Sequence, residues 1–362
     1  MLKGLQLLFL FGRPLGPFYS LAMKVRAMMY EQGFFRQNSL PVPVISVGNL
    51  VLGGTGKTPT VRHLARILGQ HGYRPAIISR GYGGKANQKI NVVSDGRSIF
   101  LTPEQAGDEP YMLAEAVPGV PVLTGTRRIH PCLRAVEEYN ADVLILDDGF
   151  QHLPVRRDLD FVLFDATVLA GNQRVFPGGI LREPLSALFR CDAFIITGLT
   201  VKNKGRAEQF GDFLKNRFPG KPVFFASLGK LTLQCSDLKA PVPSPEEPFF
   251  AFCGIANPGR FQESLKTMAI RQSGFLTLPD HVHYNQAMMT DICRQAVASG
   301  AMHLVTTHKD FVKIKNFDSP LPRYVVDICL QTKDDFDHFV LQSLQALKSR
   351  GNRPPISASD MP

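Results

Sequence analysis

The sequence predicts an α/β fold in which a mainly parallel sheet is flanked by helices. From residue 42 onward, short apolar runs such as VPVISV, VLILDD and FVLFDA alternate with stretches of helical periodicity. Because these runs are apolar almost throughout, rather than at every second position, they are typical of strands buried on both faces of a parallel sheet. Strands that alternate with helices in this way indicate parallel connections.

The N-terminal segment predicts a helix that lies on a membrane surface. Apolar residues recur with helical spacing at Phe18, Leu21, Ala22, Val25, Met28 and Met29, and the surrounding charges are Lys3, Arg13, Lys24, Arg26 and Arg36 against Glu31. An apolar stripe edged by cations suits a helix on a bilayer with anionic headgroups. The alternative is a helix that packs its stripe on the protein's own core. The run LQLLFLF at residues 5–11 is too short to span a bilayer.

The next element is a strand that leads into a phosphate-binding loop. Residues 44–59 read VISVGNLVLGGTGKTP and end in Gly56, Lys57 and Thr58 just before a helical pattern. Glycines let backbone N–H groups approach a polyphosphate, and the following helix directs its positive end at the anion. Lys57 would reach the terminal phosphates and Thr58 would bind Mg²⁺. The strict form of this loop has glycine at the position of Val51, so the match is imperfect.

Two adjacent acids end a later apolar strand. The segment VLILDD places Asp147 and Asp148 at the end of a strand, and Gly149 lets the chain turn away. At that edge of a phosphate-binding sheet, an acid typically enters the shell of Mg²⁺, which keeps few protein ligands. Two solvated acids at a strand end are the alternative.

Length and composition set the domain count and the class of partner. With 362 residues, the chain exceeds what one core usually holds. We expect an amphipathic helix over residues 1–35, a nucleotide-binding domain over 36–185 and a smaller α/β domain over 186–362. The net charge of +10 indicates an anionic partner, which could be nucleic acid, acidic lipid or a phosphorylated substrate. The six cysteines have no metal-ligand spacing and indicate a reducing compartment.

Eight motifs follow one another in an order that resembles a known protein family. They are GNLVLGGTGKTP, SRGYGGK, AGDEP, LDDGFQH, PGGILREP, FCGIANPGRF, LPDHVHY and TTHKD, and they span about residues 40–325. This order resembles the tetraacyldisaccharide 4'-kinase family. The resemblance implies a two-domain P-loop kinase with its active site in the cleft between domains, where closure of the second domain assembles the site.

The resemblance also implies a reaction and its partners. Such an enzyme uses ATP and Mg²⁺ to phosphorylate the 4'-hydroxyl of a tetraacyl disaccharide 1-phosphate, a lipid A precursor. The implied partners are this glycolipid and, through the N-terminal helix, the membrane surface, with no nucleic acid and no obligate protein partner. The implied location is the cytoplasmic face of the inner membrane of a Gram-negative bacterium.

Site residues follow from the matching motifs. The resemblance assigns ATP binding to Asn49, Val51, Leu52, Gly53, Gly54, Thr55, Gly56, Lys57 and Thr58. Asp108 matches a proposed catalytic aspartate, His281 the histidine proposed to act with it, and Arg127 an arginine that offsets charge on the transferred group. A base suits the reaction because the attacking hydroxyl must lose its proton. With Lys57 these residues form the implied catalytic set, and the implied substrate contacts are Tyr82, Gln151, Arg182 and Glu183.

Two positions depart from the family pattern. His308 stands where many relatives have glutamate in TTEKD, which puts any role of position 308 in doubt. The sequence DHVH stands where many have DHH, so His281 and His283 are alternatives for the working imidazole.

Two other classes of function compete with the kinase. The GGTGKT loop also resembles the altered P-loops of partition and metallochaperone ATPases, which would give a membrane-associated nucleotide-hydrolysing switch. A nucleotide-binding scaffold at the membrane is the class without catalysis.

Overall fold

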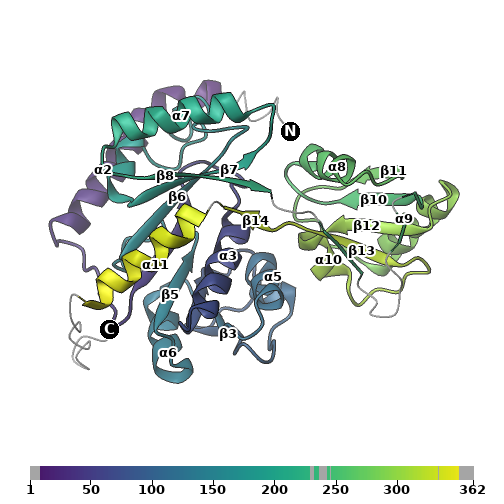
Figure 1. Cartoon of the computed structure of the whole chain (residues 1–362), viewed down its shortest axis with the longest axis horizontal. Coiled ribbons are helices and arrows are strands. Elements are labelled where there is room, and N and C mark those ends of the chain that lie inside the picture. Colours follow the sequence, from purple (N-terminus) through teal and green to yellow (C-terminus); the bar gives the residue numbers. More distant parts are fainter. Residues whose placement is uncertain (1–8, 229–231, 236–242, 245, 333, 350–362) are drawn as a thin grey trace.

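The computed structural model describes residues 9–228, 232–235, 243–244, 246–332 and 334–349, which form two sheets with helices around each (Figure 1). The larger sheet has nine strands. In spatial order they are β14 (Leu330–Gln331), β8 (Val223–Leu228), β7 (Ala193–Leu199), β6 (Leu159–Asp165), β1 (Val44–Asn49), β5 (Val143–Asp147), β2 (Pro75–Ser79), β4 (Val122–Thr124) and β3 (Asn91–Ser94).

The larger sheet is parallel except at its two edges. Strands β14 and β3 pair antiparallel with β8 and β4, and the strands between them are parallel. Strands β1, β5 and β6 are buried at every position because helices cover both faces of the sheet. This architecture confirms the prediction of an α/β fold with a mainly parallel sheet.

Helices divide between the two faces of this sheet. Helices α3 (Lys57–Gln70), α5 (Asp108–Ala116) and α11 (Asp334–Ser349) share one core with the sheet, while α6 (Ile129–Tyr139) and α7 (Lys204–Arg217) pack on the other face. The remaining helical segments of this part are η1 (Arg13–Leu15), α2 (Gly16–Glu31), α4 (Pro103–Ala106) and η2 (Leu185–Arg190).

The smaller sheet lies at the other end of the molecule (Figure 1). Its strands are, in spatial order, β11 (Gln272–Thr277), β10 (Phe249–Cys253), β12 (His303–Thr307), β13 (Arg323–Asp327) and β9 (Thr232–Cys235), of which only β9 is antiparallel to its neighbour. Helix α8 (Pro258–Thr267) covers one face, and α9 (Gln286–Ala298) and α10 (His308–Ile314) cover the other. We refer to the parts built on the larger and smaller sheets as the nucleotide lobe and the small lobe.

The two sheets do not divide at residue 186, where we expected the second domain to begin. Strands β7 and β8 continue the larger sheet beside β6, so the change of sheet comes some forty residues later than expected. The C-terminal segment then returns to the nucleotide lobe, where Phe336 of α11 packs against Phe161 and Phe224 with ring centroids 5.4 and 5.2 Å apart. That expected boundary was wrong because the apolar runs do not reveal which sheet a strand joins.

The N-terminal helix exposes its apolar stripe. In α2, Phe18 and Leu21 are 72% and 60% exposed, and Phe11 before it is 73% exposed. The opposite side of the helix rests on the nucleotide lobe, where Tyr19 meets the ring of Phe176 edge to face at 6.3 Å. The stripe therefore does not pack on the protein's own core. Residues 1–8 of the expected N-terminal helix and the tail from residue 350 lie outside the described residues.

Candidate active site

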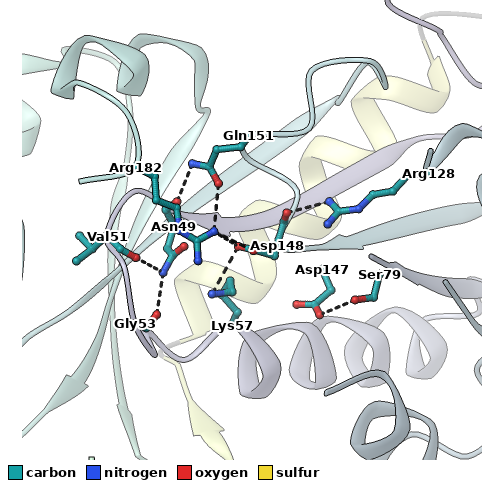
Figure 2. Close-up of polar contacts among 10 residues, drawn as sticks. All are labelled: Asn49, Val51, Gly53, Lys57, Ser79, Arg128, Asp147, Asp148, Gln151 and Arg182. Atoms are coloured by element: carbon teal, nitrogen blue, oxygen red, sulfur yellow. Dashed lines mark hydrogen bonds and ion pairs between the residues drawn. The ribbon is translucent and has the colours of Figure 1, made fainter. Parts of the chain in front are cut away.

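The phosphate-binding loop joins β1 to α3, and side chains of β1 and β7 hold its shape. The Asn49 side chain donates from Nδ2 to the carbonyl oxygens of Val51 at 2.8 Å and Gly53 at 3.2 Å (Figure 2). Thr197 on the neighbouring strand β7 donates from Oγ1 to the carbonyl of Thr55 at 2.8 Å. These contacts use loop carbonyls, and the Leu52 amide at the start of the loop donates to the Ile180 carbonyl at 2.8 Å. Asn49 thus supports the shape of the loop.

The backbone conformation at the end of the loop explains why a glycine stands there. Gly56 has a φ of 84°, and a Cβ there would lie 3.3 Å from the Thr197 side chain. Only glycine adopts this left-handed geometry without strain next to a packed neighbour. Helix α3 starts immediately afterwards at Lys57, so the N–H groups of its first turn that have no partner within the helix point toward the loop.

Lys57 lies against the second acid of the strand-end pair. Its Nζ is 3.5 Å from Asp148 Oδ1, and Arg182 Nη1 is 2.9 Å from Asp148 Oδ2 (Figure 2). Burial alone would raise the pKa of Asp148, but the positive charges of Lys57 and Arg182 outweigh it and lower that pKa. Asp148 is therefore an ionised group held between two cations.

Asp147 has the opposite environment. It is 1% exposed, and Ser79 Oγ donates to its Oδ2 at 3.3 Å, while Oδ1 is buried without a hydrogen-bond partner. Burial raises the pKa of Asp147 to about 7, and the nearby charges of Glu109 and Asp148 add to the increase. A buried carboxylate oxygen without a partner is a group that a cation would satisfy.

An arginine that the sequence analysis passed over reaches this centre. Arg127, which we expected to act on the transferred group, is exposed at the turn before α6. Its neighbour Arg128 is 3% exposed and donates from Nη1 to the carbonyl oxygen of Asp148 at 2.9 Å. Both residues precede the helix, so helical periodicity could not tell which of them points inward. The geometry favours Arg128 as the cation beside the two acids.

The expected substrate contacts separate into two groups. Gln151 and Arg182 lie at the site, since Gln151 Nε2 donates to the Asn49 carbonyl at 3.0 Å and Gln151 Oε1 accepts from Arg182 at 3.5 Å (Figure 2). Glu183 instead is 2% exposed and pairs with Arg190 at 2.8 Å, and Tyr82 is 79% exposed on the loop after β2. The structure therefore brings Gln151 and Arg182 to the acids, and it gives Glu183 a partner inside the lobe.

The loop after the acids lies in cationic surroundings and touches the N-terminal helix. Burial, reinforced by Arg128, Arg157 and Arg26, lowers the pKa of His152 to about 3, so this imidazole is neutral near pH 7. Arg26 of α2 also donates from Nη2 to the Gln151 carbonyl at 3.2 Å. Positive charge at this loop suits an anionic ligand.

Asp108 and His281 meet across the two lobes. Asp108 is the first residue of α5 in the nucleotide lobe, and His281 follows β11 in the small lobe with a φ of 58°. The distance from His281 Nδ1 to Asp108 Oδ2 is 3.3 Å. His283 is exposed and has no such partner among the described residues, so the geometry selects His281 of the two alternatives.

The residue next to Asp108 acts on one of the two acids. Glu109, next to Asp108 in α5, is close enough for its charge to raise the pKa of Asp147. Gly107, just before α5, lies against the loop after β2, where a Cβ would be 2.6 Å from the Tyr82 carbonyl oxygen, and Ser79 at the end of β2 donates to Asp147. The start of α5 therefore lies at the same edge of the sheet as Asp147.

His308 takes part in a separate contact between the lobes. Its Nε2 is 3.6 Å from Glu115 Oε2 at the far end of α5, and Lys315 pairs with the same carboxylate. In the same pocket, Arg62 of α3 pairs with Asp327 at the end of β13. Position 308 therefore contributes to the junction of the lobes, away from Asp108.

Comparison with known proteins gives the family of this chain. A model of the family described as "LpxK: Tetraacyldisaccharide-1-P 4'-kinase" matches residues 8–345. A tetraacyldisaccharide 4'-kinase of Desulfotalea psychrophila is 46% identical over 337 residues, which is 93% of this chain and 97% of the relative. Another of Syntrophus aciditrophicus is 39% identical over 341 residues, 91% of each.

A solved structure agrees in fold. The structure of LpxK from Aquifex aeolicus in complex with ATP superposes with a TM-score of 0.75 at 32% identity, and the match covers 91% of this chain and 98% of that one. No described helix of our chain is both long and apolar enough to cross a membrane. These matches do not favour a partition or metallochaperone ATPase. They confirm the resemblance carried by the eight motifs, and the chain belongs to the tetraacyldisaccharide-1-P 4'-kinase family.

Proposed function

We propose that this chain transfers the γ-phosphate of ATP to the 4'-hydroxyl of a tetraacyl disaccharide 1-phosphate, and that it does so between the two lobes. The observation that carries this proposal is the Asp108 and His281 pair, 3.3 Å apart across the two lobes, in a chain of this kinase family that also has a phosphate-binding loop. A hydrolysing switch would not need a base that is oriented by a contact between two lobes.

The role of each residue follows from its charge and from its position in the site. Asp108 would take the proton of the sugar hydroxyl as its oxygen attacks phosphorus, since a carboxylate within hydrogen-bond reach is a competent base. Lys57, Arg182 and Arg128 surround the phosphate position with positive charge, and such preorganised charge stabilises the transferring group. The meeting of the lobes would exclude water that could otherwise hydrolyse ATP.

We also assign a Mg²⁺ site to this centre. Among the described residues, no cluster of three or more His, Cys, Asp or Glu side chains is arranged to hold a metal. This fits Mg²⁺, which keeps water and phosphate ligands and takes only one or two carboxylates. Asp147, with its free buried oxygen, and Thr58 are the residues that would hold the ion. When bound, Mg²⁺ neutralises phosphate charge, and Asp148 stays with Lys57 and Arg182.

The assay for this function is transfer of labelled phosphate from ATP to purified tetraacyl disaccharide 1-phosphate, with ADP release recorded in parallel. We expect transfer to require the glycolipid and to stop when EDTA removes Mg²⁺. ADP release should be nearly absent without acceptor. Equal ADP release with and without the glycolipid would instead indicate a hydrolysing switch, and nucleotide binding without turnover would indicate a scaffold.

We further propose that the exposed stripe of α2 binds the cytoplasmic face of the inner membrane. The stripe would lie in the bilayer surface, and Arg26 would link it to the loop that carries Gln151. Burying exposed phenylalanine and leucine side chains in acyl chains is favourable by about 1 to 3 kcal/mol each. A glycolipid substrate is itself in that surface, so this attachment brings the enzyme to its acceptor.

A triple variant tests this attachment. Phe11→Ser, Phe18→Ser and Leu21→Ser together should weaken binding to vesicles with anionic lipid at least about tenfold, because the three most exposed large apolar side chains between residues 9 and 31 are lost. Transfer to acceptor dissolved in detergent should persist. The matched control replaces Val201, Val297 and Met302, which are 97%, 58% and 53% exposed elsewhere, with serine. If both variants sediment with vesicles equally well, the stripe does not anchor the protein.

A further inference from the structure

Helix α10 of the small lobe directs two lysines at the Asp108 and His281 pair. Lys309 and Lys313 are four residues apart and therefore lie on one face of the helix. Lys313 Nζ is 2.8 Å from Asp108 Oδ2, and Lys309 Nζ is 3.1 Å from His281 Nε2. Neither lysine is among the residues that the sequence analysis assigned to the site.

The contact of Lys309 decides where the proton of His281 is. A lysine ammonium only donates hydrogen bonds, so the imidazole nitrogen that it contacts must accept. Lys309 also donates to Asp280 Oδ1 at 3.0 Å, which fixes the ammonium in place. With Nε2 as the acceptor, the neutral ring carries its hydrogen on Nδ1, and that nitrogen faces Asp108 Oδ2 at 3.3 Å. A doubly protonated ring would put an N–H group against the ammonium.

The contact of Lys313 decides which oxygen of Asp108 is free to react. Lys313 and His281 both approach Oδ2, so Oδ1 is the oxygen left for a sugar hydroxyl. The Lys313 side chain is only 9% exposed, and its second contact is the Val282 carbonyl at 3.4 Å. A nearly buried ammonium held at two points keeps one orientation, and it orients the carboxylate with it.

We propose that Lys309 and Lys313 are positioning residues. They orient Asp108 and His281 so that the proton of the sugar hydroxyl goes to Asp108 and not to His281. This inference rests on the proposed kinase function. The hydroxyl O–H bond breaks and its proton goes to Asp108 Oδ1 as the hydroxyl oxygen bonds to the γ-phosphorus. The bond from that phosphorus to the bridging oxygen breaks, and its electron pair leaves on ADP. His281 stays neutral throughout and orients Asp108.

A purely structural role is the competing interpretation, because Lys313 joins the two lobes. The chain offers a matched control in Lys315, which follows α10 and also pairs across the lobes, with Glu115, but touches neither Asp108 nor His281. If the lysines served only to hold the lobes together, Lys313→Met and Lys315→Met would have similar effects.

Kinetics separate these interpretations for Lys313. We expect Lys313→Met to lower kcat by about 10- to 100-fold with KM for ATP within about twofold, because a misoriented base loses part of the usual acid–base contribution. Lys313→Arg should recover part of the rate since it keeps a positive donor. Lys315→Met should stay within about threefold of the unchanged chain, because Lys315 touches neither Asp108 nor His281 and Glu115 keeps His308 at 3.6 Å. Equal losses in the two methionine variants would overturn the positioning role of Lys313.

Nitrogen NMR of the full chain tests the role of Lys309 without turnover. The chain has nine histidines, so the signals of His281 are assigned in ¹⁵N-histidine protein by their absence from His281→Gln. We expect the Nδ1–H tautomer in the unchanged chain and a mixture of tautomers in Lys309→Met. An Nε2–H ring in the unchanged chain, or no change in the variant, would overturn the proposal. Since this readout needs no acceptor, it stands apart from any failure of the kinase assay.

Discussion

Replacing Asp108 with asparagine is expected to lower kcat for phosphoryl transfer at least about 10²-fold while the affinity for ATP stays within about twofold. Asparagine keeps the shape of the side chain but removes the basic oxygen that would receive the hydroxyl proton. Nucleotide binding should survive because the residues that hold the phosphate-binding loop, Asn49 and Thr197, do not involve α5. Transfer of labelled phosphate and a separate titration with ATP measure the two quantities.

The control for this variant must account for the lost ion pair. Asp108 is the partner of the nearly buried Lys313, so an uncharged residue at 108 leaves that ammonium without its counter-charge. We expect some loss of thermal stability for this reason, and the rates should be compared below the new melting temperature. Asp212→Asn, on the exposed face of α7, is the matched neutral change. Transfer by Asp108→Asn at the rate of Asp212→Asn would remove Asp108 from the mechanism.

The sequence predicted the parts of this protein that depend on local patterns. Strands β1 and β5 are buried at every position, as their continuous apolar runs indicated. The loop before Lys57 and the acids after β5 were found from glycine spacing and from charge at a strand end, both of which are read within a few residues. The eight ordered motifs then identified the family.

Contacts between distant segments could not be predicted in this way. Nothing near Lys313 in the sequence indicates that its ammonium reaches Asp108, because the contact depends on how the small lobe faces α5. Arg128 was missed for a related reason, since a residue before a helix has no periodic position to place it. Glu183 stands in a family motif beside Arg182, yet consecutive side chains diverge, and only Arg182 reaches Asp148.

Replacing Lys57 with alanine is expected to lower kcat/KM for transfer by about 10²- to 10³-fold, the range for losing one preorganised charge at a reacting group. The Lys57 side chain is 10% exposed and stands at the first position of α3, where the terminal phosphates would meet the helix. No other described lysine is paired with the acids that follow β5, so the lost charge has no replacement in the loop.

The fold should tolerate this change, which makes the kinetic result interpretable. Asp148 keeps Arg182 at 2.9 Å when Lys57 is removed, so the carboxylate retains a counter-charge. We expect the melting temperature to fall by no more than about 2 °C, corresponding to about 1 kcal/mol in a chain of this size. Lys204→Ala, which removes a lysine paired with Glu208 on the exposed side of α7, is the control.

Because Lys57 acts on phosphate and Asp108 on the hydroxyl, Lys57→Ala should also weaken ATP binding, whereas Asp108→Asn should not. Unimpaired transfer by Lys57→Ala would mean that the polyphosphate is held by other groups.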